Sequence, residues 1–221
     1  MAFSQESLDF LIDNYFYNSR EWYRDHKEAY QRFVFEPIAQ LVTDLTPKML
    51  EIDSEFVTAP KTGKTISRMY RDIRRVRDGM LFHKNVWCVF SRDKRLYETG
   101  APSFYFQLEQ DGFSYGCGFY CAASEKLIQM RQMILNGDKL FKKAIRAYEE
   151  QDVFVLCGDT YKRSKFPDQP KRLQNFLDRK NLFFEKQSQD TEILFSENLS
   201  EFLWNDFKKL APIYDFLLAF A

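Results

Sequence analysis

The sequence predicts an α+β fold: a single domain over residues 1–221, with a mostly antiparallel sheet covered by N-terminal and C-terminal helices. Apolar residues recur with helical spacing near both ends of the chain, and residues typical of strands cluster in the middle. The regular alternation of strands and helices that would indicate a parallel sheet is missing from the pattern. A chain of this length can bury roughly 70% of the surface of its unfolded form, so we expect a substantial core.

Three helices are expected at the N-terminal end. Ser4 suits the cap of the first, because its hydroxyl can accept a backbone N–H at the start of a helix. Asn18 and Glu21 have the spacing of a capping box, which predicts a second helix that runs to about Phe35. Pro37 fits the first turn of a third helix, because that turn needs no N–H at this position.

The middle of the chain is expected to form the sheet. Residues Gln110 to Gly112 predict a short hairpin turn between two strands, since glycine accepts the positive φ of such turns. Two more strands are expected around Gly158, and a last one follows near residue 182. The predicted strands are Val86–Ser91, Ser103–Glu109, Phe113–Cys121, Val153–Cys157, Tyr161–Lys165 and Leu182–Lys186.

Helical patterns also occur between these strands and after the last of them. Ser124 suits the cap of one helix, and Asn136 with Gly137 is a typical helix end. Ser196 is expected to cap a C-terminal helix, which Pro212 should interrupt because proline lacks the N–H that a helix interior uses. Two further helices are predicted at Leu140–Tyr148 and Lys171–Leu177.

The charge balance excludes several classes of protein. Lys plus Arg equal Asp plus Glu at 32 each, so the chain lacks the overall positive charge of a general nucleic-acid or membrane-surface binder. Any anion site must therefore be local. The first ten residues do not resemble a signal peptide, and no apolar run reaches the roughly 18 residues that span a bilayer. We expect a cytoplasmic protein that does not bind membranes.

The four cysteines, Cys88, Cys117, Cys121 and Cys157, are expected to be reduced and buried. If Cys117 and Cys121 share one strand, they lie roughly 13 Å apart at about 3.3 Å per residue, which is beyond the reach of a disulfide. The pair lacks a second pair of ligands at the spacing of a zinc site. The sequence therefore predicts no metal site, and it leaves the identity of any cofactor unknown.

The most unusual segment runs from Ile66 to Lys84, where cations greatly outnumber aspartates. Arginine binds phosphate or carboxylate groups through forked N–H donors, so this segment is a candidate anion site. The alternative is a solvated face on which arginines pair with aspartates. The cations are Arg68, Arg71, Arg74, Arg75, Arg77 and Lys84, and the aspartates are Asp72 and Asp78.

Two motifs resemble a known family, the bacterial and fungal family called domain of unknown function 2461. Asn18-Ser-Arg-Glu-Trp-Tyr23 is similar to its Asn-Asn-Arg-Glu-Trp-Phe element. Its hallmark is close to Arg-x-Tyr-Arg-Asp-x-Arg-Phe-Ser-Lys-Asp-Lys-x-Pro-Tyr-Lys. It is matched at Arg68, Tyr70, Arg71, Asp72, Arg74 and Asp78, with Arg77 in place of a lysine. The chain departs from the family at Arg75, Val76, Gly79, Leu81 and His83. The resemblance extends over nearly the whole chain and implies a compact α+β unit, but no reaction.

A second basic stretch, from Lys162 to Lys180, is the natural candidate to meet the first across a groove. Aromatic residues such as Tyr161 are able to stack on a base or sugar, although in a chain with 23 phenylalanines they more often belong to the core. The predicted ligand-binding residues are Arg68, Tyr70, Arg71, Asp72, Arg74, Lys162 and Arg163.

Signs of enzymatic chemistry are few. Lys61-Thr-Gly-Lys-Thr65 is similar to the end of a phosphate-binding P-loop, but the earlier glycine of that motif is missing. His26 is expected to pack on the aromatic face of the second helix. His83 is the better candidate for a general acid or base, with a pKa that neighbouring cations should lower, and the alternative is an exposed histidine without such a role.

The sequence therefore leaves two alternative functions. The first is the binding or turnover of a small ligand that carries a phosphate or carboxylate group, in an arginine-lined groove. The alternative is an interaction module without catalysis, which uses its basic face for an acidic protein or a nucleic acid strand. The neutral overall charge makes nucleic acid the less favoured partner.

Overall fold

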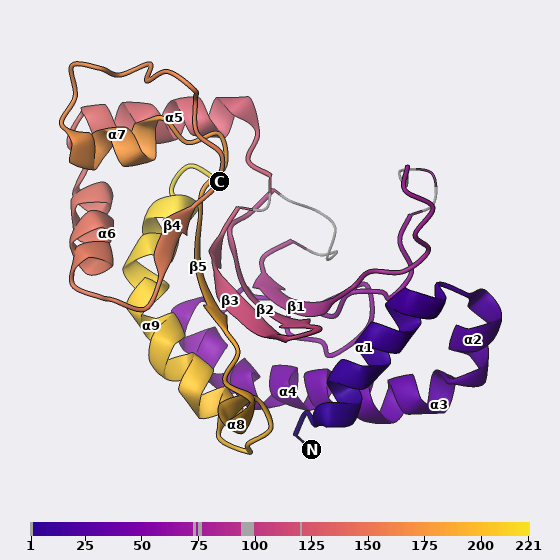
Figure 1. Cartoon of the computed structure of the whole chain (residues 1–221). Coiled ribbons are helices and arrows are strands. Elements are labelled where there is room, and N and C mark those ends of the chain that lie inside the picture. Colours follow the sequence, from indigo (N-terminus) through magenta and orange to yellow (C-terminus); the bar gives the residue numbers. More distant parts are fainter. Residues whose placement is uncertain (1, 73, 75–76, 94–99, 120) are drawn as a thin grey trace.

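An antiparallel sheet lies at the centre of the computed structural model, which describes residues 2–72, 74, 77–93, 100–119 and 121–221 (Figure 1). Within these residues, five strands pair in the order β1-β2-β3-β5-β4. The predicted α+β fold with helices beside an antiparallel sheet is confirmed. The strands are β1 (Val86–Ser91), β2 (Ser103–Glu109), β3 (Gly112–Gly118), β4 (Val155–Cys157) and β5 (Phe183–Ser188).

Four of the six predicted strands differ from the structure. β4 begins at Val155 instead of residue 153, and β5 covers Phe183–Ser188 instead of residues 182–186. β3 ends at Gly118, so Cys121 lies beyond the sheet and is exposed, and Cys157 is only partly buried. The prediction that all four thiols are buried is therefore wrong for these two residues. Tyr161–Lys165 is not a strand. Its N–H groups are bound in another way, because the backbone N–H of Lys165 donates to the side chain of Asp178 at 2.9 Å instead of to a neighbouring strand.

The N-terminal helices are interrupted where the sequence pattern predicts one continuous second helix. Asn18 does not cap that helix: it ends the first helix in the left-handed conformation, with φ 46°, and Ser19 accepts the N–H of Trp22. The backbone then leaves helical geometry at His26. The elements are α1 (Gln5–Tyr17), α2 (Arg20–Asp25), α3 (Lys27–Tyr30), the π-helical η1 (Gln31–Phe35) and α4 (Glu36–Ile52).

Pro37 lies in the first turn of α4, as predicted, and Phe35 before it is already in helical conformation. Because proline has no N–H, the carbonyl of Phe33, four residues earlier, loses its usual helical partner. The hydroxyl of Ser7, buried on α1, donates to this carbonyl at 2.5 Å. The bond satisfies the carbonyl and ties α1 to η1.

The C-terminal helices also differ from the prediction, at Pro212 and at both predicted caps. Pro212 lies inside α9, because buried neighbours on both sides of it, among them Leu210 and Ile213, hold the helix against the core. Neither predicted serine cap forms: Ser124 is the first residue of its helix, and Asn198 rather than Ser196 precedes α9. The elements are α5 (Ser124–Leu135), α6 (Lys139–Glu149), α7 (Lys171–Leu177), α8 (Thr191–Leu194) and α9 (Leu199–Leu218).

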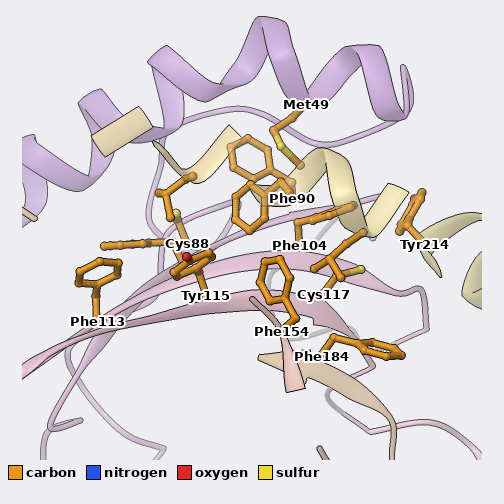
Figure 2. Close-up of a cluster of buried hydrophobic side chains, with 14 of the residues drawn as sticks. Met49, Cys88, Phe90, Phe104, Phe113, Tyr115, Cys117, Phe154, Phe184 and Tyr214 are labelled. Atoms are coloured by element: carbon orange, nitrogen blue, oxygen red, sulfur yellow. The ribbon is translucent and has the colours of Figure 1, made fainter. Parts of the chain in front are cut away.

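One face of the sheet packs against helices and forms a core rich in aromatic rings (Figure 2). Phe104 of β2 lies edge-on to Phe207 of α9, with ring centroids 5.3 Å apart. Tyr115 of β3 packs against the same ring at 5.9 Å. Each fully buried ring of this size stabilises the fold by roughly 1.5–3 kcal/mol, so these rings make the contact between the sheet and α9 an important part of the core.

Two buried tyrosines fix α9 through polar contacts. Tyr115 donates its hydroxyl to Asp206 at 2.6 Å, and Tyr214 donates to Asp53, which also accepts two bonds from Arg92. Burial and these carboxylates raise the pKa of both phenols. Burial alone would raise the pKa of Asp53, but its bonds from Arg92 and Tyr214 leave that pKa lowered. The phenols therefore remain protonated donors.

The opposite face of the sheet carries polar side chains in cross-strand rows. One row places Gly116 of β3 between Tyr105 of β2 and Glu185 of β5. With no side chain between them, the Tyr105 hydroxyl reaches across to Glu185 and donates to Oε2 at 2.7 Å. A Cβ at position 116 would lie 1.9 Å from the carbonyl oxygen of Phe184, so only glycine fits there.

Among the described residues, no helix combines the length and the apolar character that crossing a bilayer requires.

Candidate functional site

Residues 65–84, which we call the arginine arm, run along the outer edge of β1 and turn back towards it. The N–H of Val89 donates to Thr65, and the N–H of Ser67 donates to Trp87, so the arm continues the sheet beyond β1. Further out, the N–H of Arg71 donates to Leu81 at 2.8 Å. Arg75 lies outside the described residues.

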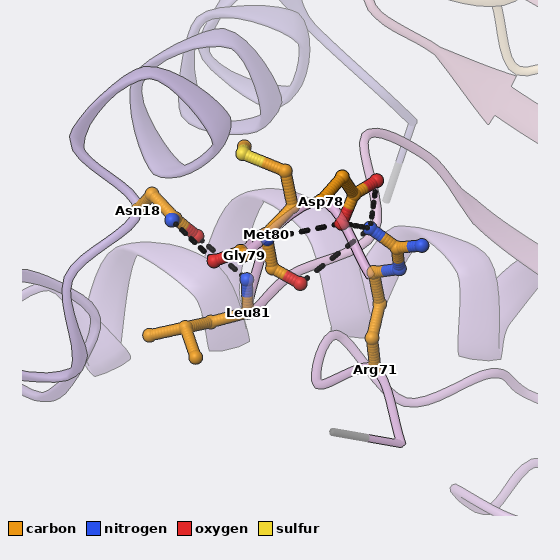
Figure 3. A network of polar contacts seen from close by, with 6 residues as sticks. All are labelled: Asn18, Arg71, Asp78, Gly79, Met80 and Leu81. Atoms are coloured by element: carbon orange, nitrogen blue, oxygen red, sulfur yellow. Dashed lines mark hydrogen bonds and ion pairs between the residues drawn. The ribbon is translucent and has the colours of Figure 1, made fainter. Parts of the chain in front are cut away.

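The side chain of Asn18 holds the arm against the junction of α1 and α2 (Figure 3). Its Nδ2 donates to the carbonyl of Gly79 at 3.1 Å, and its Oδ1 accepts the N–H of Leu81 at 2.7 Å. Tyr23 of α2 packs against Tyr70 with ring centroids 5.2 Å apart. These contacts bring together the two sequence motifs on which the family resemblance rests.

Two arginines of the arm bind carboxylates of the arm itself. Arg71 donates through Nη1 to both oxygens of Asp78 at 2.9 Å, and this interaction lowers the pKa of Asp78. Arg74 forms a two-pronged pair with Asp72, also at 2.9 Å. The Arg74 side chain is 86% exposed, whereas that of Arg71 is 28% exposed. These contacts match the alternative in which arginines pair with neighbouring aspartates.

His83 lies half-buried at the base of the arm, edge-on to Trp87 with ring centroids 4.9 Å apart. Burial, followed by the positive charges of Arg71 and Arg68, lowers its pKa to about 4. The imidazole is therefore neutral at pH 7. Arg68 and Tyr70 are exposed.

The second basic stretch surrounds the ring of Tyr161. The Nζ of Lys165 lies 4.0 Å from the ring centroid, and Lys180 and Arg131 each approach to 5.6 Å. The backbone of this region is fixed, because the N–H of Tyr161 donates to the carbonyl of Asp178. Lys162 and Arg163 lie exposed in the same loop. We call this group, Arg131, Lys162, Arg163, Lys165 and Lys180 around Tyr161, the Tyr161 cluster.

The cations of the Tyr161 cluster differ from those of the arm in their partners. Within the described part of the chain, none of them forms an ion pair with a carboxylate. The buried carboxylate of Asp178 accepts the backbone N–H of Lys165 instead.

The predicted ligand-binding residues therefore fall into two separate groups. In Figure 1 the arginine arm extends at the right of the sheet, while the loop that carries Lys162 and Arg163 lies at the upper left beside α5 and α7. The structure brings Arg68, Tyr70, Arg71, Asp72 and Arg74 together on the arm, and places Lys162 and Arg163 elsewhere.

A pocket of about 290 Å³ lies between the C-terminal end of α6, α7 and β4, and we call it the arginine pocket. Its apolar floor includes Leu156 and Phe176, which are 7% and 5% exposed. Tyr148 stands edge-on to Phe176 and accepts the N–H of Leu156, so the floor is held in one arrangement. The lining residues are Tyr148, Glu149, Leu156, Arg172, Asn175, Phe176 and Arg179.

Arg179 is fixed at the wall of this pocket by backbone carbonyls. Its Nε donates to Asn175 at 3.1 Å, its Nη2 donates to Leu156 at 3.1 Å, and its Nη1 donates to Gly158. No carboxylate of the described residues pairs with it. Its guanidinium charge therefore remains uncompensated at the pocket.

At the rim, Arg172 forms a two-pronged ion pair with Glu149, with both N···O distances at 2.5 Å. The side chains are 57% and 42% exposed, and an exposed pair is worth at most about 1 kcal/mol. A ligand that competes for Arg172 would therefore lose little free energy by breaking this ion pair.

Sequence reasoning placed Arg172 and Arg179 in a basic stretch but missed the pocket. The signal was present, because residues 172, 175, 176 and 179 have the i, i+3, i+4, i+7 spacing of one helix face. In the described chain, no three side chains of metal-ligand type converge.

The fold and its basic segments define the class: an antiparallel α+β protein whose cations are anchored to its own carboxylates, carbonyls and rings. Comparison with known families matches residues 6–216 to the family described as conserved hypothetical protein (DUF2461). Because the match covers nearly the whole chain, the protein belongs to this family. No curated protein and no solved structure matches the chain.

Proposed function

We propose that the protein binds a small ligand carrying a phosphate or carboxylate group, and that the arginine pocket holds this ligand. The observation that supports the proposal is Arg179, whose guanidinium is fixed by three carbonyls and pairs with no carboxylate of the described residues. A charged donor that is already ordered loses little conformational entropy when it binds an anion.

The other groups around the pocket suit the same role. Arg172 supplies a second guanidinium at the rim, in an exposed pair that a competing anion can open. Leu156 and Phe176 supply an apolar surface that excludes water from part of the ligand. The proposal covers binding and assigns no reaction.

Thermal melts with a panel of anions test this proposal. A ligand at 100 times its dissociation constant adds about 2.7 kcal/mol to the free energy of unfolding, which is readily measured. Phosphate, sugar phosphates, nucleotides and simple carboxylates form the panel. We expect at least one of them to raise the melting temperature at low salt.

A matched pair of variants locates the effect. Arg172→Gln removes the guanidinium at the rim and should reduce the stabilisation by the best anion. Arg146→Gln is the control, because Arg146 also pairs with an exposed glutamate, Glu150, on α6 but does not line the pocket. Equal responses of the two variants, or no stabilisation by any anion, would contradict the proposal.

A second candidate function is docking of an acidic protein or nucleic acid strand on the Tyr161 cluster. It is favoured by the cations there that form no ion pair with the described carboxylates. Phosphates of a flexible strand can reach several exposed lysines at once, and a ring offers a stacking surface. This function would show a steep loss of affinity with salt.

We also propose that the protein is located in the cytoplasm. Cys121 and Cys157 are free and at least partly accessible, and accessible thiols persist in a reducing compartment.

A further inference from the structure

We infer that the arginine pocket selects a monocarboxylate with a compact apolar body over a phosphate. This inference rests on the proposed function, because it names the class of ligand for the same pocket. Three features of the pocket support it: the N–H groups left on Arg179, the net charge of the lining, and the apolar floor.

The first feature is the number of donors that Arg179 still offers. A guanidinium has five N–H groups, and three of them bind the carbonyls of Leu156, Gly158 and Asn175. One N–H remains on each terminal nitrogen. Two donors bind both oxygens of a carboxylate. They can also bind two oxygens of a phosphate, but the third oxygen then has no donor from Arg179.

The second feature is the charge of the lining residues. Arg172 and Arg179 are positive and Glu149 is negative, so the lining carries one net positive charge. A carboxylate neutralises this charge. A phosphate monoester carries about −1.5 to −2 at pH 7, and its second charge would lie close to Glu149 without a cation of its own.

The third feature is the floor and the size of the pocket. Leu156, Phe176 and the ring of Tyr148 offer apolar surface. A ligand with a hydrocarbon group gains free energy by burying that group against this surface, whereas inorganic phosphate has no such group. A volume of about 290 Å³ lies at the small end of ligand pockets, which start near roughly 300 Å³. A phenyl ring or a short branched chain fits this size.

The inference is tested by calorimetric titration with five probes that separate charge from shape. Benzoate and 3-methylbutanoate carry one carboxylate on a compact apolar body, and benzyl alcohol is a neutral analogue. Phenyl phosphate and inorganic phosphate carry the competing anion. We expect the two carboxylates to bind, benzyl alcohol not to bind, and phenyl phosphate to bind more weakly than benzoate.

The variant Asn175→Asp tests whether benzoate binds in the arginine pocket. Asn175 is exposed on α7 and lines the pocket, so the nearly isosteric change preserves the fold while it cancels the net positive charge. We expect benzoate affinity to fall by about three- to tenfold, as for a like charge near the surface. A substitution of Arg179 itself is not used, because it would leave three backbone carbonyls without hydrogen-bond donors and so disturb the fold.

The control is Asn205→Asp, the same substitution at an exposed position of α9 that does not line the pocket. It should leave benzoate affinity unchanged. Stronger binding of phenyl phosphate or phosphate than of benzoate overturns the selectivity but keeps the proposed function. Benzoate binding that Asn175→Asp does not weaken overturns the assignment to this pocket. Binding of none of the anions overturns both proposals.

Discussion

The arginine arm and the stretch from Tyr161 to Lys180 are both rich in cations, yet the two regions use them differently. In the arm, Asp78 and Asp72 lie within the same run and bind Arg71 and Arg74. In the second stretch, Asp178 is buried and accepts a backbone N–H instead. We therefore expect anion binding in the second stretch and not in the arm. The following predictions test this contrast from the largest expected effect to the smallest.

The attachment of the arm should depend most on Asn18. Asn18→Ala removes two hydrogen bonds, worth about 0.5–1.5 kcal/mol each. It also places alanine, which tolerates the left-handed region less well than asparagine, at φ 46°, at a further cost of at most about 1–2 kcal/mol. The free energy of unfolding, measured in urea, should fall by about 2–4 kcal/mol.

Asn18→Gly separates the two causes, because glycine accepts φ 46° without strain but offers no side chain. Its loss of stability should be clearly smaller than that of Asn18→Ala. If both variants unfold at the same urea concentration as the wild type, Asn18 does not hold the arm.

His83 should make the protein less stable in acid. Its folded pKa of about 4 is lower than the value near 6.5 of an unfolded chain, so the unfolded state binds the proton first as the pH falls. Stability is unaffected by this group above about pH 7 and declines between about pH 6.5 and 4, by about 1–2 kcal/mol after allowance for partial exposure.

The measurement compares His83→Gln with the wild type at a series of pH values, because carboxylates titrate in the same range in both proteins. As the pH falls, the free energy of unfolding of the wild type should decrease more than that of His83→Gln. Parallel curves would show that His83 is not buried as described.

The two ion pairs of the arm should differ in their effect on stability. Arg71→Ala removes the less exposed guanidinium, and the melting temperature should fall by about 2–4 °C, which for this chain length corresponds to roughly 1 kcal/mol. Arg74→Ala should leave the melting temperature unchanged, because its pair is largely solvated. A larger effect of Arg74→Ala would reverse this assignment.

The smallest effect on stability, and the clearest effect on binding, is expected in the Tyr161 cluster. The double variant Lys165→Gln, Lys180→Gln should fold as the wild type does. If a single-stranded oligonucleotide binds there, the slope of log affinity against log salt should become shallower by about 0.7 for each lost phosphate contact. Lys139→Gln with Lys142→Gln, two exposed lysines of α6, is the control and should not change the slope.

Most of the fold follows from local patterns in the sequence. β1, β2 and α7 have the predicted bounds, because runs of aromatic and β-branched residues and short helical spacing mark them in the sequence. The misses occur where tertiary contacts override a local rule. Buried neighbours carry α9 through Pro212, and the left-handed Asn18 ends α1 instead of starting the next helix.

The site was harder to predict because its parts come from distant segments. Arg172 and Arg179 stood in the basic stretch, but Leu156 and Glu149 join them only once β4 and α6 pack beside α7. The pairing of Arg71 with Asp78 agrees with the alternative in which arginines pair with aspartates, since both residues lie in the same basic segment of the sequence. Which cations lack a carboxylate depends on side-chain directions that spacing alone does not determine.

The contact between α9 and the sheet has a consequence for how the protein is made. Residues Ser103–Gly118 can pair into a hairpin early in synthesis, but the helix that covers Phe104 and Tyr115 starts only at Leu199. A nascent chain therefore carries an apolar sheet face in water while about eighty further residues are added, and such faces promote aggregation. Ribosome-bound chains that stop before Leu199 should accordingly be protease-sensitive and bind chaperones, whereas chains that have released α9 should resist both.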